Sequence, residues 1–520
     1  MSIRASTRLL PIFASALLLV AACGGPAESP APGTVGPGTP PASPDQPTPG
    51  LTPGEETPGM TPGESPDASP GTSPDASPGT SPDASPGTSP GTGAPAPSGA
   101  TGDLFAFGVQ YQEGADEIAT ERIDFFTDNN PDVNITFSES GFDEASFLTS
   151  LQTAQPPDVV RMDTAVLGTY VARGVLAPMD DCFAQHGIDP GKYYDAPLNQ
   201  ATIDGQIYGV PEFMTTMNWL INESAFTDAG LDPANFDFSN WDEIRSANEA
   251  TLQVEGGVNA LGIDPKVPEF LPLWAKANGA DLLSEDGMTA QLDSPEVVDA
   301  LQLAVDLIDA HGGASPFLDF RGTWDFFGAA NQFATDLVAA HPMEQWYLNV
   351  LVGASPDADV LARPFVDRQG NGLTYATGGS IAITEASQNK EAACAFALSI
   401  THEDAWVRAA QVRKEMRDAS GEANTGVFTA NETANDRIFS EIVIPSELPA
   451  PWGDNLQVYL DNWANAFAVP ASPANAAIFL GNESIVAQAV ARAMEGEDVQ
   501  TVLTEANQEA QSAIDQAAGN

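Results

Sequence analysis

Basic side chains are scarce in this sequence. Its 520 residues contain 19 Lys and Arg against 72 Asp and Glu, which gives a formal net charge of −53 at pH 7. A surface this acidic repels the phosphates of nucleic acids and the headgroups of anionic lipids. We therefore exclude nucleic acid as a partner and expect no electrostatic attraction to a membrane surface.

Histidine and cysteine are also rare, with four and three copies. The histidines are scattered along the chain, and no group of residues has the spacing of metal ligands. The sequence has no Gly-x-Ser-x-Gly motif and no phosphate-binding glycine loop, and His402-Glu403-Asp404 lacks the second histidine of a zinc-binding helix. We expect no catalytic residue, no metal site and no cofactor.

The one prominent apolar run, at the start of the chain, is too short to cross a bilayer, which takes about 20 residues. Arg4 and Arg8 introduce the run Leu9–Val20, and small residues with Cys23 follow it. These features are typical of a secretory signal peptide, which we assign to residues 1–22. The end of the segment resembles the lipobox of bacterial lipoproteins, which predicts lipidation of Cys23. The alternative is an ordinary signal peptide with an incidental cysteine.

The next segment, residues 23–102, lacks the residues that build a core. Between Gly24 and Gly102 there is no aromatic residue and no Lys or Arg, and proline occupies 21 of these 79 positions. The unit Ser65–Thr72 recurs twice in register. Such a segment cannot offset its chain entropy by burial, so we predict a disordered tether that lifts a folded body off the membrane.

Two cysteines remain in the body, Cys182 and Cys394. A location outside the cytoplasm permits a disulfide between them. Cys394 lies within Ala392–Leu398, which has the pattern of a buried helix face, so a buried free thiol is the alternative. The sequence leaves both open.

The body, residues 103–520, alternates strand and helix patterns. Three apolar strand-like segments are separated by amphipathic ones, in the order Asp103–Val109, Glu113–Asn129, Val133–Phe137, Phe142–Thr153, Pro157–Asp163 and Ala165–Arg173. This order predicts an α/β fold with a parallel sheet and helices on both faces. A body of about 418 residues is too long for one ordinary core and predicts two lobes.

Ligands of open parallel sheets bind beyond the carboxyl ends of the strands. Tyr111 and Gln112 follow the first predicted strand, and Asp163 and Thr164 end the third. We therefore expect Tyr111, Gln112 and Asp163 to contact a ligand.

Several segments of the body resemble, in order, the extracellular solute-binding proteins of the maltose-binding type. They are Pro157–Val160, Gly174–Asp180, Ile203–Pro211, Asn222–Phe226, Ala229–Asp232, Asn240–Ile244, Gly378–Ile383 and Ser387–Ala393. Their order and spacing follow the pattern of that family, and together they cover essentially the whole body.

The resemblance implies a two-lobed, periplasmic-binding-protein-like fold with hinge crossovers between the lobes. The first lobe would take residues 103–213 and return over 378–420, and the second lobe would take 214–377. Residues 421–520 would form the C-terminal helical part of the second lobe. Gly378 and Gly379 would be hinge residues, because a glycine pair suits a strand that must flex. Without the resemblance, a plain turn is the alternative.

The resemblance also places a ligand between the lobes. Sugars are recognised by flat apolar surfaces and by planar polar groups that match the hydroxyls. Together with the three strand-end residues, the candidates are Glu212 and Phe213 at the first crossover, Trp346 and Tyr347 after a helix-like run, and Trp452 before the C-terminal helices. For each aromatic residue, packing in the core is the alternative, and we assign Trp241 and Trp274 to packing.

We predict a membrane-tethered receptor of an ABC importer on the extracytoplasmic face, a monomer that binds a carbohydrate and is not an enzyme. Its partners would be a small solute and the importer permease, and it would meet the membrane only through its lipid anchor. The alternatives are an envelope-tethered glycan hydrolase, a receptor of the same fold for a polyamine or peptide, and a sensory or adhesive module.

Overall fold

The computed structural model describes residues 94–109, 111 and 116–519. The predicted signal peptide, the predicted lipidation site Cys23 and the predicted ligand residue Gln112 lie outside these residues. No helix in the described part of the chain is long and apolar enough to span a membrane.

A mixed six-stranded sheet forms the centre of the first lobe. Its strands lie in the order β2-β1-β3-β13-β4, and β7 pairs with β13. As predicted, the first three strands are parallel, whereas β13 runs antiparallel to β3, β4 and β7. The bounds are β1 Thr101–Gly108, β2 Asp132–Gly141, β3 Val159–Asp163, β4 Leu176–Ala177, β7 Val210–Thr215 and β13 Thr377–Thr384; β5 Thr202–Ile203 and β6 Gln206–Ile207 pair separately.

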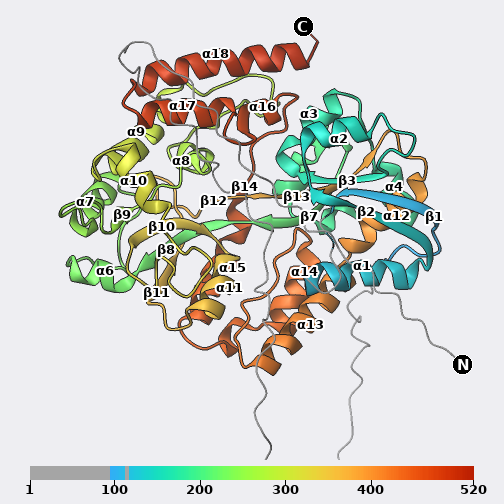
Figure 1. Ribbon diagram of the computed structural model, residues 1–520, viewed down its shortest axis with the longest axis horizontal. Helices are drawn as coiled ribbons and strands as arrows, with labels where there is room; N and C mark the ends of the chain where they lie inside the picture. The colour runs from blue at the N-terminus through green and yellow to red at the C-terminus, as the bar shows by residue number, and fades with distance from the viewer. Residues whose placement is uncertain (1–93, 110, 112–115, 520) are drawn as a thin grey trace, which may run out of the picture. The chain divides into compact units, whose positions relative to one another are not determined.

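Helices cover both faces of this sheet (Figure 1). Phe126 and Phe396 pack on one face, while Phe147 and Tyr170 belong to a separate buried cluster on the other. The helices of this lobe are α1 Glu117–Asn129, α2 Glu144–Ser150, η1 Thr164–Val166, α3 Leu167–Ala172, α4 Asp180–His186, η2 Pro190–Lys192, α5 Asp195–Gln200, α12 Lys390–Ile400, α13 Glu403–Ser420, α14 Glu432–Arg437 and η3 Ile438–Ile442.

The two cysteines of the body are joined. Cys182 on α4 and Cys394 on α12 form a disulfide with their Cα atoms 5.7 Å apart. The sequence left a disulfide and a buried free thiol as alternatives, and the structure has the disulfide.

A four-stranded sheet in the order β11-β8-β10-β9 forms the centre of the second lobe. β8 is antiparallel to β10 and β11, and β9 is parallel to β10. An aromatic cluster packs beside it, in which Trp219 stacks on Phe238 and Phe365 at 4.3 and 5.5 Å between ring centroids. The strands are β8 Met217–Asn222, β9 Leu261–Ile263, β10 Val338–Glu344 and β11 Val360–Arg363.

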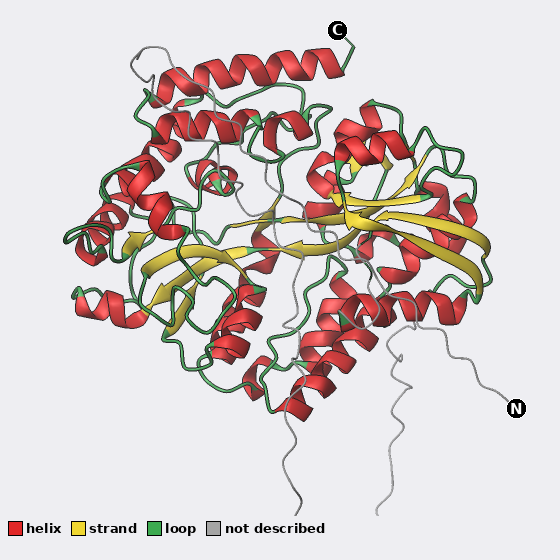
Figure 2. Cartoon of the chain, viewed as in Figure 1, coloured by secondary structure: helices red, strands yellow, loops and turns green. Residues whose placement is uncertain are grey.

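Trp241 and Trp274 belong to this core, as expected, with both side chains buried. The helices of the second lobe surround the sheet, as Figure 2 shows. They are α6 Glu223–Asp228, α7 Trp241–Thr251, α8 Leu271–Ala277, α9 Pro295–Asp309, α10 Ala314–Arg321, α11 Tyr347–Ala354, η4 Pro445–Glu447, α15 Trp452–Asn462, η5 Trp463–Asn465, α17 Ile485–Met494 and α18 Val499–Ala517.

Two adjacent crossovers connect the sheets. Strand β7 leads through Thr216 into β8, and the chain returns through Ala376 from β12 (Thr374–Tyr375) into β13. Strand β12 also pairs with β14 (Ala466–Phe467). The molecule therefore has the two-lobed α/β fold with crossovers between the lobes that the resemblance implies.

The segment after residue 420 is divided between the two lobes, whereas the sequence predicted that all of it belongs to the second lobe. Helix α14 stays with the first lobe, where Arg437 forms an ion pair with Asp404 at 2.7 Å. Helix α16 (Asn475–Phe479) also touches that lobe, because Ala476 N–H donates to Thr169 Oγ1 at 3.1 Å. The prediction that all of 421–520 belongs to the second lobe was therefore too simple.

The folded body also begins earlier than residue 103. Asn130 donates its side-chain amide to the carbonyl of Pro97 at 3.1 Å and accepts from Ala100 N–H at 2.9 Å. Residues 94–102, predicted as the end of the tether, are thus held against α1. Their small apolar side chains resemble the tether in composition, which is why the pattern did not separate them.

Candidate functional site

The carboxyl ends of strands from both sheets meet at the crossovers. In the first lobe, Asp163 ends β3 and pairs in register with Gly379 of β13. In the second lobe, Glu344 ends β10 and pairs with Met217, the residue that follows the crossover residue Thr216. Since ligands of such sheets bind beyond these strand ends, the crossovers mark the candidate site.

The first-lobe side contains two of the predicted residues. Asp163 is exposed, and the ring of half-buried Tyr111 packs on Phe137 with centroids 4.8 Å apart. Burial holds the pKa of Tyr375 well above its usual range, and the negative charge of Asp163 raises it further. Asp163 therefore lies within electrostatic range of the second crossover.

Glu212 is tied into the first lobe by two arginines. Its buried carboxylate accepts hydrogen bonds from Arg122 at 2.8 Å and from Arg161 at 2.5 Å. Burial alone would raise the pKa of Glu212, but the two guanidinium groups lower it to about 2. Arg161 also lies over the ring of half-buried Phe213, 5.2 Å from its centroid. Through these ion pairs, Glu212 on β7 connects this strand to α1 and to β3.

The predicted hinge glycines allow two strands to approach closely. A Cβ on Gly378 would lie 2.0 Å from the carbonyl oxygen of Phe213, and one on Gly379 would lie 3.0 Å from the Phe213 ring. The β13–β7 register shifts between Gly379 and Ser380. Only glycine fits at position 378, and a hinge role for the pair remains a prediction.

Charged residues cluster on the second-lobe side, beyond β9 and β10. Lys266 forms an ion pair with Glu344 at 3.5 Å, and Arg321 forms one with Asp264 at 3.1 Å. Burial alone would lower the pKa of Arg321, but Asp264, Glu269 and Glu344 raise it. This cluster combines planar carboxylate acceptors with the planar guanidinium of Arg321 and the ammonium of Lys266, groups that recognise hydroxyls.

An aromatic surface lies next to these charges. Trp346 is 8% exposed, and its ring is nearly parallel to that of Phe327, with centroids 6.2 Å apart and an angle of 21°. Phe327 is 43% exposed, which is rare for a large apolar side chain in the described part of this protein. The ring of Phe326 contacts both, with centroid distances of 5.0 Å to Phe327 and 6.3 Å to Trp346, and its centroid lies 5.9 Å from the Lys266 ammonium. We call Phe327 and Trp346 the aromatic platform.

The other two predicted aromatic residues are engaged inside the second lobe. Tyr347 is fully buried, and its hydroxyl is within hydrogen-bonding distance of the Phe326 carbonyl at 2.8 Å and of Gln332 Oε1 at 3.0 Å. Trp452 is also buried and donates its indole N–H to the carbonyl of Pro356 at 3.2 Å. For these two side chains the structure favours packing, the alternative that the sequence left open.

Sequence reasoning did not identify Phe327, Lys266 or Glu344. Phe327 lies in an irregular loop between α10 and β10, and Lys266 follows a strand of only three residues. Lys266 and Glu344 could have been identified from the rule that ligands bind beyond the carboxyl ends of the strands, but we applied that rule only to the first lobe.

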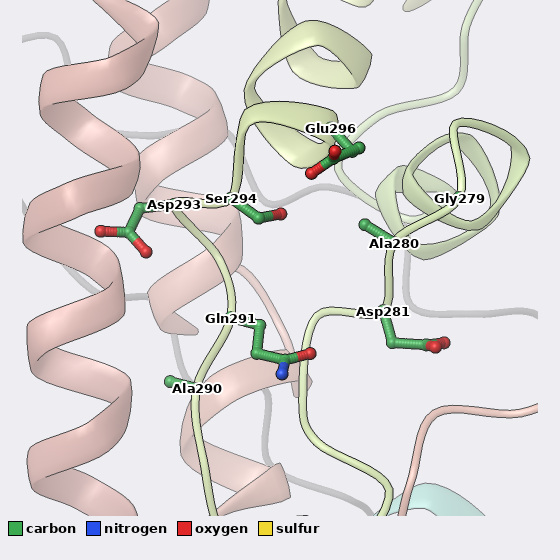
Figure 3. A pocket seen from close by; sticks show the side chains of 8 residues that line it. All are labelled: Gly279, Ala280, Asp281, Ala290, Gln291, Asp293, Ser294 and Glu296. Atoms are coloured by element: carbon green, nitrogen blue, oxygen red, sulfur yellow. The ribbon is translucent and has the colours of Figure 1, made fainter.

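A separate hollow lies away from the strand ends, in the second lobe. It has a volume of about 440 Å³ and opens between the loop after α8 and the start of α9 (Figure 3). Asp281, Asp293 and Glu296 line it, and none of the predicted ligand residues does. No cluster of His, Cys, Asp or Glu suited to a metal ion occurs among the described residues.

Sequence comparison identifies a family model and a curated relative. The family model for bacterial extracellular solute-binding proteins matches residues 108–406. An arabinooligosaccharide-binding protein of Halalkalibacterium halodurans is 25% identical over 274 residues, which are 47% of this chain and 57% of that protein. The chain thus aligns with little more than half the length of this curated relative.

Solved structures share the fold at low sequence identity. CpMnBP1 with bound mannotriose is 18% identical, with a TM-score of 0.60 over 78% of this chain and 99% of that one. UgpB from Mycobacterium tuberculosis, in complex with glycerophosphocholine, is 19% identical, with a TM-score of 0.60 over 80% and 99%. A solute-binding protein of Thermotoga lettingae bound to α-D-tagatose is 20% identical, with a TM-score of 0.59 over 80% and 100%.

Proposed function

The chain belongs to the bacterial extracellular solute-binding proteins, and we propose that it is the receptor of an ABC importer for a carbohydrate or oligosaccharide. Members of this family act outside the cytoplasm and bind their solutes. The proposal concerns the solute, the place where it binds and the partners.

The aromatic platform is the observation that supports a sugar most strongly. The C–H face of a pyranose or furanose ring is apolar and packs on a flat aromatic side chain, and an exposed aromatic surface otherwise costs free energy in water. Phe327 supplies such a surface, and Trp346 stacks on Phe327. Lys266 and Glu344 lie close by as partners for hydroxyl groups.

The balance of charge at the second-lobe strand ends favours a neutral solute over a polyamine. The carboxylates of Asp264 and Glu344 are paired with Arg321 and Lys266. A polyamine site needs carboxylates that the protein itself leaves uncompensated. The acidic charge of Asp264 and Glu344 is therefore compensated at these strand ends, although Glu269 adds a third carboxylate nearby.

On the first-lobe side, Tyr111, Gln112 and Asp163 remain our candidates for contacts with the solute. Phe213 remains a candidate through its half-buried ring. Glu212, Tyr347 and Trp452 enter the proposal as residues that support the site from within the protein. Gly378 and Gly379 remain the candidate hinge.

Lipidation of Cys23 would anchor the receptor to the membrane, with residues 24–93 as the tether. The importer permease would be its protein partner, and the receptor would act as a monomer. Replacement of Cys23 by Ser tests the anchor, because the variant should appear in the culture medium while the parent protein stays with the membrane fraction. Equal membrane retention of the two proteins would contradict lipid anchoring.

The solute is tested by calorimetric titration of the purified protein with arabinotriose, mannotriose, maltotriose, spermidine and a tripeptide. We expect saturable binding of one oligosaccharide, and a thermal shift that corresponds to about 2.7 kcal/mol at a hundred times its dissociation constant. Chromatography of the recovered sugar should show it intact. Cleaved sugar would indicate the hydrolase alternative, and binding of spermidine alone would overturn the choice of solute.

A further inference from the structure

Gln345, the residue before Trp346, forms hydrogen bonds to the first crossover between the lobes. Gln345 is buried, and its side-chain carbonyl accepts a hydrogen bond from Thr216 N–H at 2.7 Å. Its side-chain amide donates to the carbonyl of Met214 at 3.0 Å, and its backbone N–H donates to the carbonyl of Thr216 at 3.2 Å. One glutamine directly after β10 thus bonds the backbone of β7 and of the link between β7 and β8.

Four residues further on, Asn349 holds a second segment of the first lobe. Its side-chain amide donates to the carbonyl of Gly426 at 2.8 Å, and its side-chain oxygen accepts from Thr425 N–H at 3.0 Å. Residues 424–426 connect α13 to α14, which are both packed in the first lobe. Asn349 therefore makes an interlobe contact independent of the crossover.

Gln345 and Trp346 form the turn that leads into α11, and Asn349 lies on the first turn of that helix. The turn is closed by hydrogen bonds from Leu348 N–H to the Gln345 carbonyl and from Asn349 N–H to the Trp346 carbonyl, at 3.1 and 3.0 Å. A displacement of Trp346 is therefore transmitted to both side-chain amides. The aromatic platform and the two interlobe contacts share one short rigid element.

Unsatisfied polar groups are found in the same two segments. The hydroxyls of Thr216 and Thr425 and the side-chain amide of Asn424 are buried and have no hydrogen-bond partner among the described residues. A buried polar group without a partner is unfavourable, and such groups are uncommon in stable cores. These three groups lie in the two segments to which Gln345 and Asn349 form hydrogen bonds.

We propose that Gln345 and Asn349 are positioning residues that couple the aromatic platform to the arrangement of the two lobes. A solute that packs on the platform shifts the first turn of α11, and this turn moves both the crossover and the segment 424–426. The inference rests on the proposed function only for the presence of a solute at Trp346. The coupling between the two segments is a property of the protein alone.

The coupling can be measured without solute, by amide hydrogen exchange with peptide resolution on the full protein. Replacement of Gln345 by Leu removes both side-chain hydrogen bonds at similar size. We expect exchange to become about tenfold faster at residues 214–217 and also at 424–426, because a hydrogen bond of ordinary net strength corresponds to about that factor. Peptides from β1 report any global loss of stability and should remain unchanged.

The matched control is Asn455→Leu. Asn455 is a buried amide that also forms two backbone hydrogen bonds, accepting from Ala362 N–H and donating to the Val360 carbonyl, both at 2.8 Å. These bonds lie within the second lobe, so this variant should affect 360–362 and leave 214–217 and 424–426 unchanged. If Asn455→Leu accelerates exchange at all three places, the effect of Gln345→Leu is general destabilisation, and the proposal fails.

Acceleration confined to 214–217 in Gln345→Leu would also overturn the coupling. If that variant does not fold, Asn349→Ala tests the same link from the other end, because Asn349 is only half-buried. It should accelerate exchange at 214–217, where it makes no contact of its own. Failure of every solute to bind would overturn the proposed function and leave this test intact.

Discussion

The rings of Phe327 and Trp346 are stacked 6.2 Å apart, and the outer ring, Phe327, is 43% exposed. The stack joins a loop before β10 to the residue at the start of α11, so it exists only in the folded protein. Its exposed face is what the proposed sugar site depends on.

Replacement of Phe327 by Ala should weaken binding of the sugar identified by titration by about tenfold to a hundredfold, since an aromatic contact contributes about 1–3 kcal/mol to binding. Phe327→Tyr should retain most of the affinity, whereas Phe327→Leu should lose most of it, because leucine is apolar but not flat. Isothermal titration of the three variants measures the effect.

Leu318 provides a matched control for this series. It lies on α10 in the same lobe and is 45% exposed, about as much as Phe327. Leu318→Ala should bind the sugar with unchanged affinity and have a similar melting temperature. Equal affinity of Phe327→Ala and the parent protein would remove Phe327 from the site.

The free energy of unfolding at acidic pH should depend on Glu212. Its pKa is about 2 in the folded protein, against an ordinary value of 4.5, so its contribution is complete above pH 4.5 and is lost as the pH falls toward 2. The contribution is on the order of 3 kcal/mol at neutral pH. Urea denaturation at intervals between pH 5 and pH 2 measures it.

Glu212→Gln tests the assignment. The variant removes the carboxylate that forms ion pairs with Arg122 and Arg161, which should cost about 3–5 kcal/mol at pH 7. Its stability should also fall less steeply than that of the parent protein between pH 4.5 and pH 2. A parallel fall in the two proteins would mean that other carboxylates carry the acid dependence.

The sequence predicted the first lobe well because local signals determine it. The strands and helices up to α3 follow clear apolar periods, and their parallel order follows from the alternation. The contacts of Glu212 could not be predicted from such local patterns. Its partners Arg122 and Arg161 are 90 and 51 residues away, and no local pattern shows that the crossover strand brings the three side chains together.

The second-lobe side could not be predicted for a related reason. Phe327 stacks on Trp346 across a loop with no periodic pattern, and Lys266 meets Glu344 only because β9 and β10 pair in parallel. Trp452 illustrates the opposite error, since a tryptophan at the start of a helix is equally consistent with sugar binding and with packing in the core. Burial, which separates the two, is a property of the fold.

Reduction of the Cys182–Cys394 disulfide should destabilise the first lobe. The bond closes a loop with a sequence separation of 212 residues, and loss of a native disulfide typically costs about 2–5 kcal/mol. Thermal denaturation with and without a reducing agent measures the change. A variant with serine at both positions should already melt at the lower temperature and should not respond to the reductant; a response would point to an effect other than reduction of this bond.

Mild acid should also weaken the second lobe through His341. Burial lowers the pKa of His341 to about 3, an effect to which Lys266 and Arg321 contribute and which Asp264 opposes. The unfolded chain, with an ordinary histidine pKa near 6.5, takes up the proton first, so stability falls by about 1.4 kcal/mol per pH unit below 6.5. Between pH 7 and pH 5 the contribution of this residue is about 2 kcal/mol, in a range where Glu212 is still fully ionised.

Replacement of His341 by Gln separates the effect of this side chain on stability from that of the other groups that titrate between pH 7 and pH 5. The variant should lose less stability than the parent between pH 7 and pH 5 in urea denaturation, although a smaller fall should remain because burial also lowers the pKa of His311 and His186. The ring of His341 stacks on Phe333 at 5.1 Å, so the variant should be less stable at pH 7. The change in slope is therefore the decisive quantity, and identical slopes in the two proteins would show that folding does not lower the pKa of His341.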